Sequence, residues 1–267
     1  MSDQATADAI NEAIEDPVPH MAAFPDTTTE LLRGLYDSDK DKWHTEVEVR
    51  ELTGEDEEYL ASLEKKKGLL YVEYMTGLLT RAIIRIGDLE IPNGARGESL
   101  INKLMLADRD IAYLAVVKAT YGNARTVHVP CPECRTMNDV TLELDKDFQT
   151  KYPDFDIKKG IEVEISTGTV RLRLPNGQDS LETSKSSKTD AEVNTAMIAQ
   201  CAVWADGERP ASLMGWARGL RMADRKKLVD ALLEVEIGPS LEEVETQCAS
   251  CGKDMPILLD WVSLLFG

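Results

Sequence analysis

Two Cys-x-x-Cys pairs constrain this chain most strongly, and together they hold four of its five cysteines. The count and the spacing are those of a structural zinc site with four thiolate ligands. If both pairs bind one ion, the end of the chain is fixed to its middle, and the segment between them becomes an excursion from a small zinc ribbon. A closed site of this kind leaves zinc no open position for a substrate. The motif therefore predicts one structural Zn²⁺ per chain, bound by Cys131, Cys134, Cys248 and Cys251.

Two other interpretations of the cysteine pairs stay open, namely a redox dithiol and inert cysteines. A thioredoxin-like dithiol would open a helix in a βαβ unit, whereas strand-like segments flank both pairs here. Gly252 follows the second pair and suits the positive φ that such a turn usually needs. Arg135 occupies the same place after the first pair, so that turn departs from the commonest pattern. The fifth cysteine, Cys201, lies in an apolar helical stretch, and we expect it to be a small buried side chain.

The chain is strongly acidic, with a formal net charge of -18, and most of that charge lies in its first 60 residues. Phosphate binding needs a basic surface, so nucleic acid is not expected as the main partner. The acidic stretch is either a solvated, partly disordered tail or an arm that docks on a basic partner. The densest basic cluster is either a solvated helix face or a docking patch for an acidic arm, its own or a neighbour's; it comprises Arg218, Arg221, Arg225, Lys226 and Lys227.

Neither a membrane span nor a secretory signal is expected. No apolar run reaches the roughly 18 residues of a membrane span, because charged residues interrupt the best candidate, residues 68–86. The acidic N-terminus has no basic region followed by an apolar one. Few cysteines, paired at metal spacing, fit a reducing compartment. We therefore expect synthesis in a cytoplasm and no membrane partner.

The predicted fold class is α+β, a mainly helical domain combined with a small zinc ribbon and a β-hairpin, preceded by an extended acidic N-terminal arm. Prolines at 17, 19 and 25 would break a helix in that arm. We expect four parts: the extended arm over residues 1–42, a strand plus helical domain over 43–124, a split zinc ribbon with a C-terminal apolar segment over 125–145 and 241–267, and a β-hairpin and helical insertion over 146–240.

Hydrophobic periodicity places the individual elements. Alternation predicts a half-buried strand over residues 43–52, strands over 125–130 and 138–144 around the first cysteine pair, and a β-hairpin over 161–166 and 169–175. Helical spacing predicts helices over 69–86, 98–106, 108–121, 190–204, 211–221 and 224–236. Gly122 is expected to end one of these helices. The polar residues 176–188 are expected to form a mobile loop.

Two apolar surfaces could pack within the chain or against another subunit. The first is a stripe on the helix over residues 69–86, made of Tyr71, Met75, Leu78, Leu79, Ala82 and Ile86. The second is the C-terminal segment, which contains Leu258, Leu259, Trp261, Val262, Leu264, Leu265 and Phe266. A segment with this many apolar side chains is expected to pack against another protein surface. We expect both surfaces to join the chain's own core, and a subunit contact is the alternative for each.

No catalytic motif is found, so an enzyme is not predicted. The chain has no glycine-rich phosphate loop, no G-x-S-x-G and no His-Glu-x-x-His. Its three histidines are scattered, and His128 near the first cysteine pair is expected on a strand surface, with a place beside the metal ligands as the alternative. The acidic residues Asp108 and Asp110 are explained as helix caps or surface residues.

Several of these features occur together in one known family. Residues 104–144 contain Asp110, Tyr121-Gly122 and the first cysteine pair before a strand, and Gly238, the second cysteine pair and an apolar end follow. With the acidic stretch over residues 47–58, this arrangement resembles the tailed-bacteriophage baseplate hub or tail assembly proteins, related to the baseplate hub subunit of T-even phages. The resemblance covers residues 45–267, and the acidic arm lies outside it.

The resemblance implies a non-enzymatic role in building the phage tail or baseplate, as a virion component of the hub or wedge or as an assembly factor. It implies other tail and baseplate proteins as partners, several copies in a symmetric assembly, and a place in the virion after assembly in the host cytoplasm. The alternative is a zinc-ribbon module that binds nucleic acid or acts in transcription. That function needs a basic face near the cysteines, where only Arg125, Arg135 and Lys253 are found.

Overall fold

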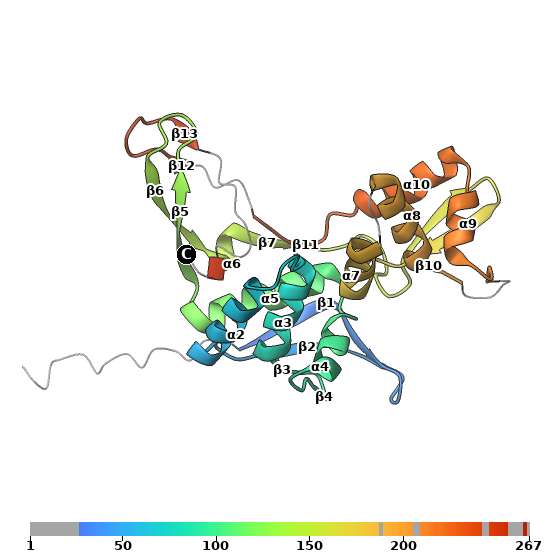
Figure 1. Cartoon of the computed structure of the whole chain (residues 1–267), viewed down its shortest axis with the longest axis horizontal. Coiled ribbons are helices and arrows are strands. Elements are labelled where there is room, and N and C mark those ends of the chain that lie inside the picture. The colour runs from blue at the N-terminus through green and yellow to red at the C-terminus, as the bar shows by residue number, and fades with distance from the viewer. Residues whose placement is uncertain (1–26, 187–188, 205–208, 242–245, 256–263, 266–267) are drawn as a thin grey trace, which may run out of the picture.

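The chain forms a central body, a long hairpin that projects from it, and a second lobe on the other side (Figure 1). The computed structural model describes residues 27–186, 189–204, 209–241, 246–255 and 264–265. The first 26 residues of the expected arm therefore lie outside the described residues. The described residues form several small antiparallel sheets together with helices in the body and the second lobe, which confirms the α+β class. Within the described residues, no helix is both long and apolar enough to cross a bilayer.

The body contains an antiparallel four-stranded sheet in the order β1-β2-β3-β4. Its strands are β1 (Thr28–Asp37), β2 (Lys42–Val49), β3 (Ile83–Ile86) and β4 (Leu89–Glu90). The predicted strand after residue 43 is confirmed as β2, in which Val47 and Val49 are buried. The structure differs for residues 28–37, which were expected in the extended arm. They form β1 because Leu31 and Leu35 supply apolar side chains to the core.

Helices α2 (Gly54–Glu64), α3 (Tyr71–Ala82), α4 (Ala95–Ile101) and α5 (Leu106–Tyr121) complete the body. The helix predicted over residues 69–86 was too long, since the β-branched run that begins at Ile83 pairs with β2 instead. Its apolar stripe is buried in the body core except for Tyr71, which is 50% exposed. Gly122 ends α5 with a φ of 83°, as predicted.

Helix α5 is anchored to β1 through the buried carboxylate of Asp108. The pairing of β1 with β2 shifts register between Glu30 and Leu35. The backbone N–H groups of Leu32 and Gly34 donate to Asp108 at 2.7 and 2.9 Å, and that of Arg33 donates at 3.2 Å. The expectation that Asp108 caps a helix or lies on the surface was wrong, because it accepts the N–H groups that the irregular strand leaves unpaired.

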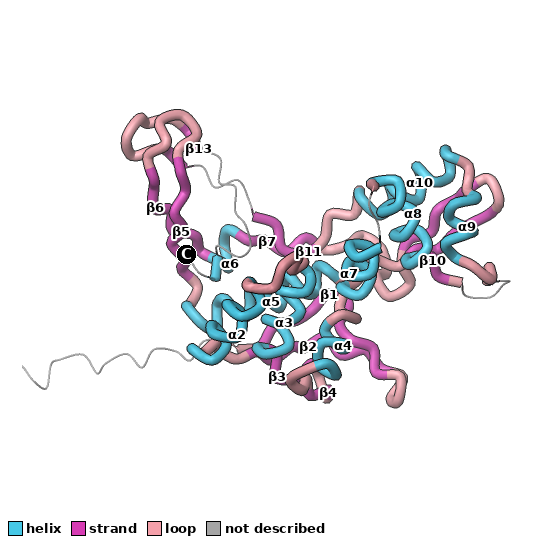
Figure 2. The backbone as a smooth tube through the Cα atoms, in the orientation of Figure 1, coloured by secondary structure: helices cyan, strands magenta, loops and turns pink. Residues whose placement is uncertain are grey.

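After α5 the chain forms the projecting hairpin, which we call the ribbon arm (Figure 2). Strands β5 (Ala124–Pro130) and β6 (Met137–Glu143) pair along their whole length. Much later in the chain, the short strands β12 (Thr246–Gln247) and β13 (Asp254–Met255) form a second hairpin at the tip of the ribbon arm (Figure 1). The strands predicted on both sides of the first cysteine pair are confirmed.

The base of the ribbon arm is closed by a second pairing of distant segments. Helix α6 (Leu144–Asp147) leads to β7 (Phe148–Lys151), which pairs antiparallel with β11 (Gly238–Leu241). Leu264 and Leu265 are buried in the body core, and their carbonyl oxygens accept hydrogen bonds from the Arg125 side chain at 2.7 and 3.2 Å. These two residues of the C-terminal segment pack on the chain's own core, as expected, and the other apolar residues of that segment lie outside the described residues.

The second lobe has its own apolar core, which includes Leu172, Ile198 and Leu228. The predicted hairpin is confirmed as β8 (Ile161–Ile165) and β9 (Gly168–Leu172), and β10 (Ala202–Val203) joins the same sheet. The helix expected over residues 190–204 ends earlier, where β10 begins. The helices of the lobe are α7 (Gly177–Ser186), α8 (Asp190–Cys201), α9 (Leu213–Gly219) and α10 (Met222–Leu233).

Helix α7 corrects the loop expected over residues 176–188. Asp179 in its first turn accepts a forked hydrogen bond from Arg173 and donates its backbone N–H to the Asn176 side chain. Thr183, one turn later, is buried and donates to Gln200 of α8. These tertiary contacts stabilise a segment whose polar composition indicated a loop. Cys201, at the end of α8, is fully buried as predicted, and burial raises the pKa of its thiol to about 12.

Candidate metal centre

The two cysteine pairs meet at the tip of the ribbon arm, although more than a hundred residues separate them in the sequence. Cys131 and Cys134 lie in the turn between β5 and β6, and Cys248 and Cys251 lie in the turn between β12 and β13. We call each of these turns a knuckle. The four sulfur atoms all lie within 4.8 Å of one another. The structure therefore brings together all four of the predicted ligands.

The separations of the sulfur atoms fit a tetrahedral ion. Cys131 Sγ lies 3.8 Å from Cys251 Sγ, and Cys134 Sγ lies 3.6 Å from Cys248 Sγ. A tetrahedron with metal–sulfur bonds of about 2.3 Å has edges of about 3.8 Å between its sulfur atoms. Four thiolates at this distance repel one another strongly unless a cation lies between them. The cluster is thus compatible with a metal site of four sulfur ligands.

The two knuckles share the same backbone hydrogen bonds and the same positive φ at equivalent residues. The N–H of Cys131 donates to the carbonyl of Thr136, and the N–H of Cys248 donates to that of Lys253, both at 2.9 Å. In each knuckle the residue after the second cysteine donates back to the first cysteine and has a positive φ. This residue is Arg135, with a φ of 61°, in one knuckle and Gly252, with a φ of 68°, in the other.

The positive φ confirms that the first knuckle departs from the usual pattern at Arg135. A side chain in this region of φ is strained by contact between its Cβ and the backbone, whereas glycine is not. The repeated geometry indicates that both knuckles present their sulfur atoms in the same way, by two related hairpins.

Polar groups from both knuckles surround the sulfur atoms. Cys134 Sγ lies 3.3 Å from the Thr136 hydroxyl, and hydrogen bonding by Thr136 lowers the pKa of the Cys134 thiol to about 6. The backbone N–H of Ser250 lies 3.4 Å from Cys248 Sγ. These contacts favour the thiolate form that metals bind. The first cysteine of each knuckle is buried and the second is exposed, so one side of the cluster faces solvent.

Asn138 links the two knuckles and was missed by the sequence analysis. Its side-chain oxygen accepts the N–H of Ala249 at 2.9 Å, and its side-chain nitrogen donates to the carbonyl of Thr136 at 2.8 Å. The alternation of β6 places it on the same buried face as Val140 and Leu142. A polar residue at an inward-facing strand position was the signal that could have identified it.

The other candidate residues lie apart from the cluster. His128 lies on β5, where its Nδ1 is 2.7 Å from the Asp139 carboxylate and both side chains are exposed. This position agrees with the expected strand surface. His44 is buried in the body, and His20 lies outside the described residues.

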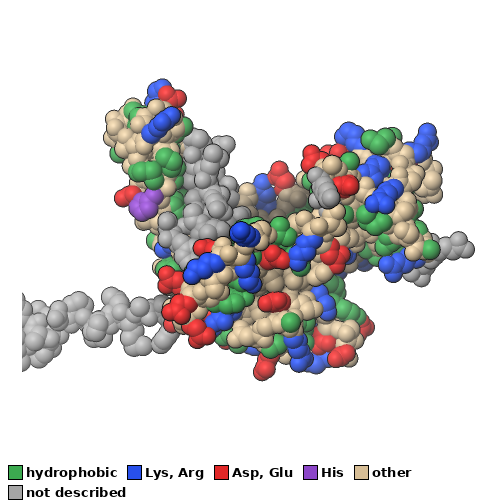
Figure 3. Space-filling view, viewed as in Figure 1, with side chains coloured by type: hydrophobic (Ala, Val, Ile, Leu, Met, Phe, Trp, Pro, Cys, Tyr) green, Lys and Arg blue, Asp and Glu red, His purple; other side chains and the backbone are tan. Residues whose placement is uncertain are grey.

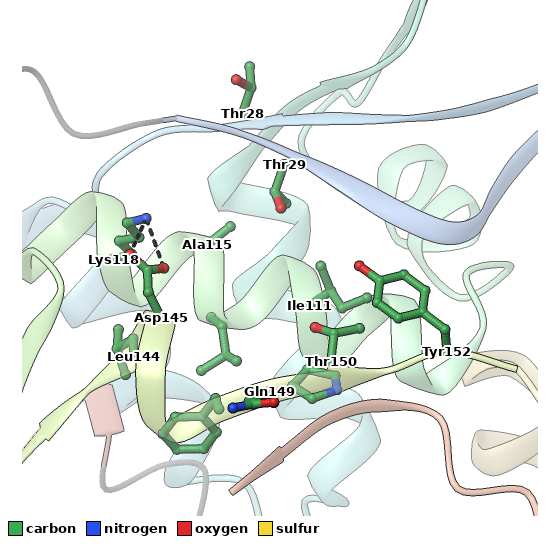
Figure 4. A pocket seen from close by; sticks show the side chains of 13 residues that line it. Thr28, Thr29, Ile111, Ala115, Lys118, Leu144, Asp145, Gln149, Thr150 and Tyr152 are labelled. Carbon is green, nitrogen blue, oxygen red and sulfur yellow. Dashed lines mark hydrogen bonds and ion pairs between the residues drawn. The ribbon is translucent and has the colours of Figure 1, made fainter. Parts of the chain in front are cut away.

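A groove of about 440 Å³ lies between β1, α5 and β7 (Figure 4). Its floor includes Ile111, and Thr29 and Thr150 face it from the two strands. The charged residues that line it, Lys118 and Asp145, form an ion pair at 2.9 Å. Neither histidine nor cysteine is among the described residues that line this groove.

The fold and the cysteine cluster together define a class, an α+β protein in which four clustered cysteines lie where two distant chain segments meet in a ribbon. The comparison with protein families is more specific. Residues 36–266 match the family described as T4 bacteriophage base plate protein. The match spans most of the chain, so the chain belongs to this family, as the sequence resemblance indicated. No curated protein and no solved structure matches the chain.

Proposed function

We propose that this chain is a non-enzymatic structural or assembly protein of the phage tail baseplate, as a hub or wedge component or as a tail assembly factor. Membership of the base plate family carries the proposal. The chain would work through contacts with other tail and baseplate proteins, in several copies in a symmetric assembly. It would reach the virion after synthesis in the host cytoplasm.

We further propose that the cysteine cluster binds one structural Zn²⁺ per chain, with Cys131, Cys134, Cys248 and Cys251 as ligands. The sulfur separations of 3.6 and 3.8 Å and the four-thiolate set support zinc, because tetrahedral sulfur sites suit this ion. When bound, the ion would neutralise the thiolates and complete the ribbon. The four ligands would fill its coordination sphere, which agrees with a structural role.

In this proposal the second lobe is an insertion between the two halves of the ribbon, and the metal would join those halves. The lobe leaves the body after β7 and returns at β11, so the pairing of β7 with β11 closes its base. The metal would join the same two chain segments a second time, at the tip of the ribbon arm. Because the site would form only in the folded chain, the free energy of metal binding would add to the free energy of folding. The chain between β7 and β11 supports our proposal that residues 146–240 are an insertion.

The alternative function, nucleic-acid binding by the ribbon, has little support near the knuckles. Arg125 donates to the carbonyls of Leu264 and Leu265, and Lys253 forms an ion pair with Glu133 at 3.0 Å. Acidic and basic side chains are interspersed on the visible face of the molecule (Figure 3). Phosphate binding needs a continuous basic surface instead. A filter-binding assay with salt-sensitive, submicromolar DNA affinity would revive this alternative.

Mass spectrometry of purified virions tests the proposed place of the protein. A component of the baseplate is expected at a constant ratio to other tail proteins. An assembly factor is expected in tail intermediates from infected cells and to be absent from mature virions. Detection in neither sample would contradict the proposal.

A further inference from the structure

The groove between β1, α5 and β7 lies between two strand edges that no described strand covers (Figure 4). Among the described strands, β1 is the outermost of its sheet and pairs only with β2, and β7 pairs only with β11. Helix α5 forms the floor, where the side chain of Ile111 is buried and those of Leu114 and Ala115 are half-buried. An extended segment in this groove would therefore have an apolar floor beneath it and a strand on either side.

The pairing of β1 with β2 shows which backbone groups of β1 point toward the groove. The carbonyl of Thr27 accepts the N–H of Val49 at 2.8 Å, so the backbone groups of Thr27 face β2. Directions alternate along a strand, so those of Glu30 face away from β2. The N–H of Leu32 points to this same outer edge, where it donates to Asp108 of α5. Among the described contacts, the N–H of Glu30 has no acceptor.

Strand β7 points equivalent groups toward the groove from the other side. Thr150 lies opposite Pro239 in the pairing of β7 with β11. Proline has no N–H, so the hydrogen bonds between these strands come from the residues on either side of this pair. The N–H and carbonyl of Thr150 therefore point away from β11, and Thr150 lines the groove. Within the described part of the chain, its N–H has no acceptor either.

The described chain begins beside the groove, since Thr27 immediately precedes Thr28 and Thr29, which line it. A segment that fills the groove can therefore come from the residues just before β1. Residues 17–25 contain no aspartate, glutamate, lysine or arginine, whereas residues 1–16 are acidic. The uncharged part of the N-terminal segment is thus the part nearest to β1 in the sequence, and it suits an apolar floor.

We propose that residues 20–24 of this chain fill the groove as an added strand, antiparallel to β1. Pro25 and Asp26 support a reversal of the chain before β1, because both residues favour turns. Antiparallel neighbours can be joined by so short a connection. Pro19 would end the strand at its other side, about where the Asp108 carboxylate binds the edge of β1. The residues between the two prolines have a typical strand length.

In this arrangement the N–H and carbonyl groups of Glu30 and Thr150 would bond to the added strand from opposite sides, as in peptide recognition by strand addition. The strand would join the four-stranded sheet of the body to the pair of β7 and β11 at the base of the ribbon arm. The inference goes beyond the proposed baseplate function. It depends neither on the metal nor on the family match, which begins at residue 36.

Hydrogen exchange of backbone amides tests the proposal, by comparing the full chain with a chain that lacks residues 1–24. The N–H groups of Glu30 and Thr150 should exchange at least about tenfold faster in the shortened chain, because they lose their hydrogen-bond partners. The N–H of Gly87 bonds to the Glu46 carbonyl in the same sheet at 2.7 Å. Its exchange should stay the same, which would show that the sheet is still folded.

A point variant repeats the test in the full-length chain. Ala22→Pro removes an N–H from the middle of the proposed strand, so it should speed exchange at Glu30, at Thr150 or at both. Ala7→Pro is the matched control in the acidic part of the segment and should change neither. Equal exchange at both amides in the full and shortened chains overturns the proposal. Protection that rises with protein concentration overturns it too, because another copy would then fill the groove.

Discussion

The carboxylate of Asp108 on α5 accepts a hydrogen bond of 2.9 Å from the backbone N–H of Gly34 in β1. The same carboxylate accepts the N–H groups of the two preceding residues, so one side chain takes the place of a missing neighbouring strand. Gly34 has a φ of 76°, and a Cβ on it would come within 2.0 Å of the His44 carbonyl oxygen. The body of the molecule therefore depends on an acid and a glycine that are 74 residues apart.

Replacing this acid tests that dependence. Asp108→Ala leaves several buried N–H groups without an acceptor, so it should lower the free energy of unfolding by about 3 kcal/mol or more. Urea unfolding of the native and variant chains measures the difference. Asp145→Ala is the control, because Asp145 forms an exposed ion pair with Lys118 and should cost less than about 1 kcal/mol. Equal losses in the two variants would contradict the assignment.

The buried carboxylate of Asp56 makes the body sensitive to acid. Burial raises its pKa, but hydrogen bonds from Arg50, Arg81 and the Thr53 backbone N–H outweigh this effect and hold the pKa well below its usual range. A group with a lowered pKa in the folded state stabilises the fold above its unfolded pKa, about 3.9 for aspartate. This contribution is lost progressively as the pH falls below that value.

Asp56→Asn removes this titration. At neutral pH the variant should be less stable than the native chain by about 3 kcal/mol, because two arginines lose a buried partner. The difference between the two chains should shrink as the pH falls from 5 toward 3. Urea unfolding at a series of pH values gives both results, and a difference that is constant with pH would refute the account.

Substitutions at the equivalent positive-φ position of the two knuckles should change the stability of the protein in opposite directions. Arg135→Gly relieves the strain of a positive φ and should stabilise the protein by about 1 kcal/mol. Gly252→Ala introduces the same strain in the other knuckle and should destabilise it by a similar amount. Thermal unfolding of the metal-loaded chains measures both. If both substitutions destabilise, the knuckles do not share one geometry.

Asn138 should support the metal site without touching the ion. Asn138→Ala breaks its hydrogen bonds to both knuckles, so we expect zinc affinity to fall roughly tenfold. Competition with a chromophoric chelator measures this affinity. Asp139→Ala on the opposite face of β6 is the matched control and should leave the affinity unchanged, since Asp139 binds only His128 among the described contacts.

Local sequence patterns correctly predicted the hairpin around the first cysteine pair and the meeting of the two cysteine pairs. The spacing of Cys131 and Cys134 fixes a turn, and alternating residues on both sides fix the strands, so each knuckle follows from short-range information. The pairing of these cysteines with Cys248 and Cys251 followed from the preference of zinc for four ligands.

Features that depend on distant contacts were missed. Asp108 has no local sign of burial, because its partners lie in an irregular strand in another part of the sequence. Helix α7 looks like a loop by composition, and it forms because Arg173 and α8 hold its first and second turns. A strand begins at Ile83, where the sequence analysis predicted that the helix would continue. Apolar periodicity is a local pattern, so it does not show that these residues pair with β2.

The central claim is that one zinc ion joins the two knuckles, and the zinc content of the purified full chain tests it most directly. Elemental analysis should find one zinc per chain in the native protein and in Cys201→Ala, whose cysteine lies in the core of the second lobe. Cys131→Ser and Cys248→Ser should each lose the ion, because each removes a ligand from a different knuckle. Native protein with well under one zinc per chain, or both serine variants with full zinc content, would contradict the account.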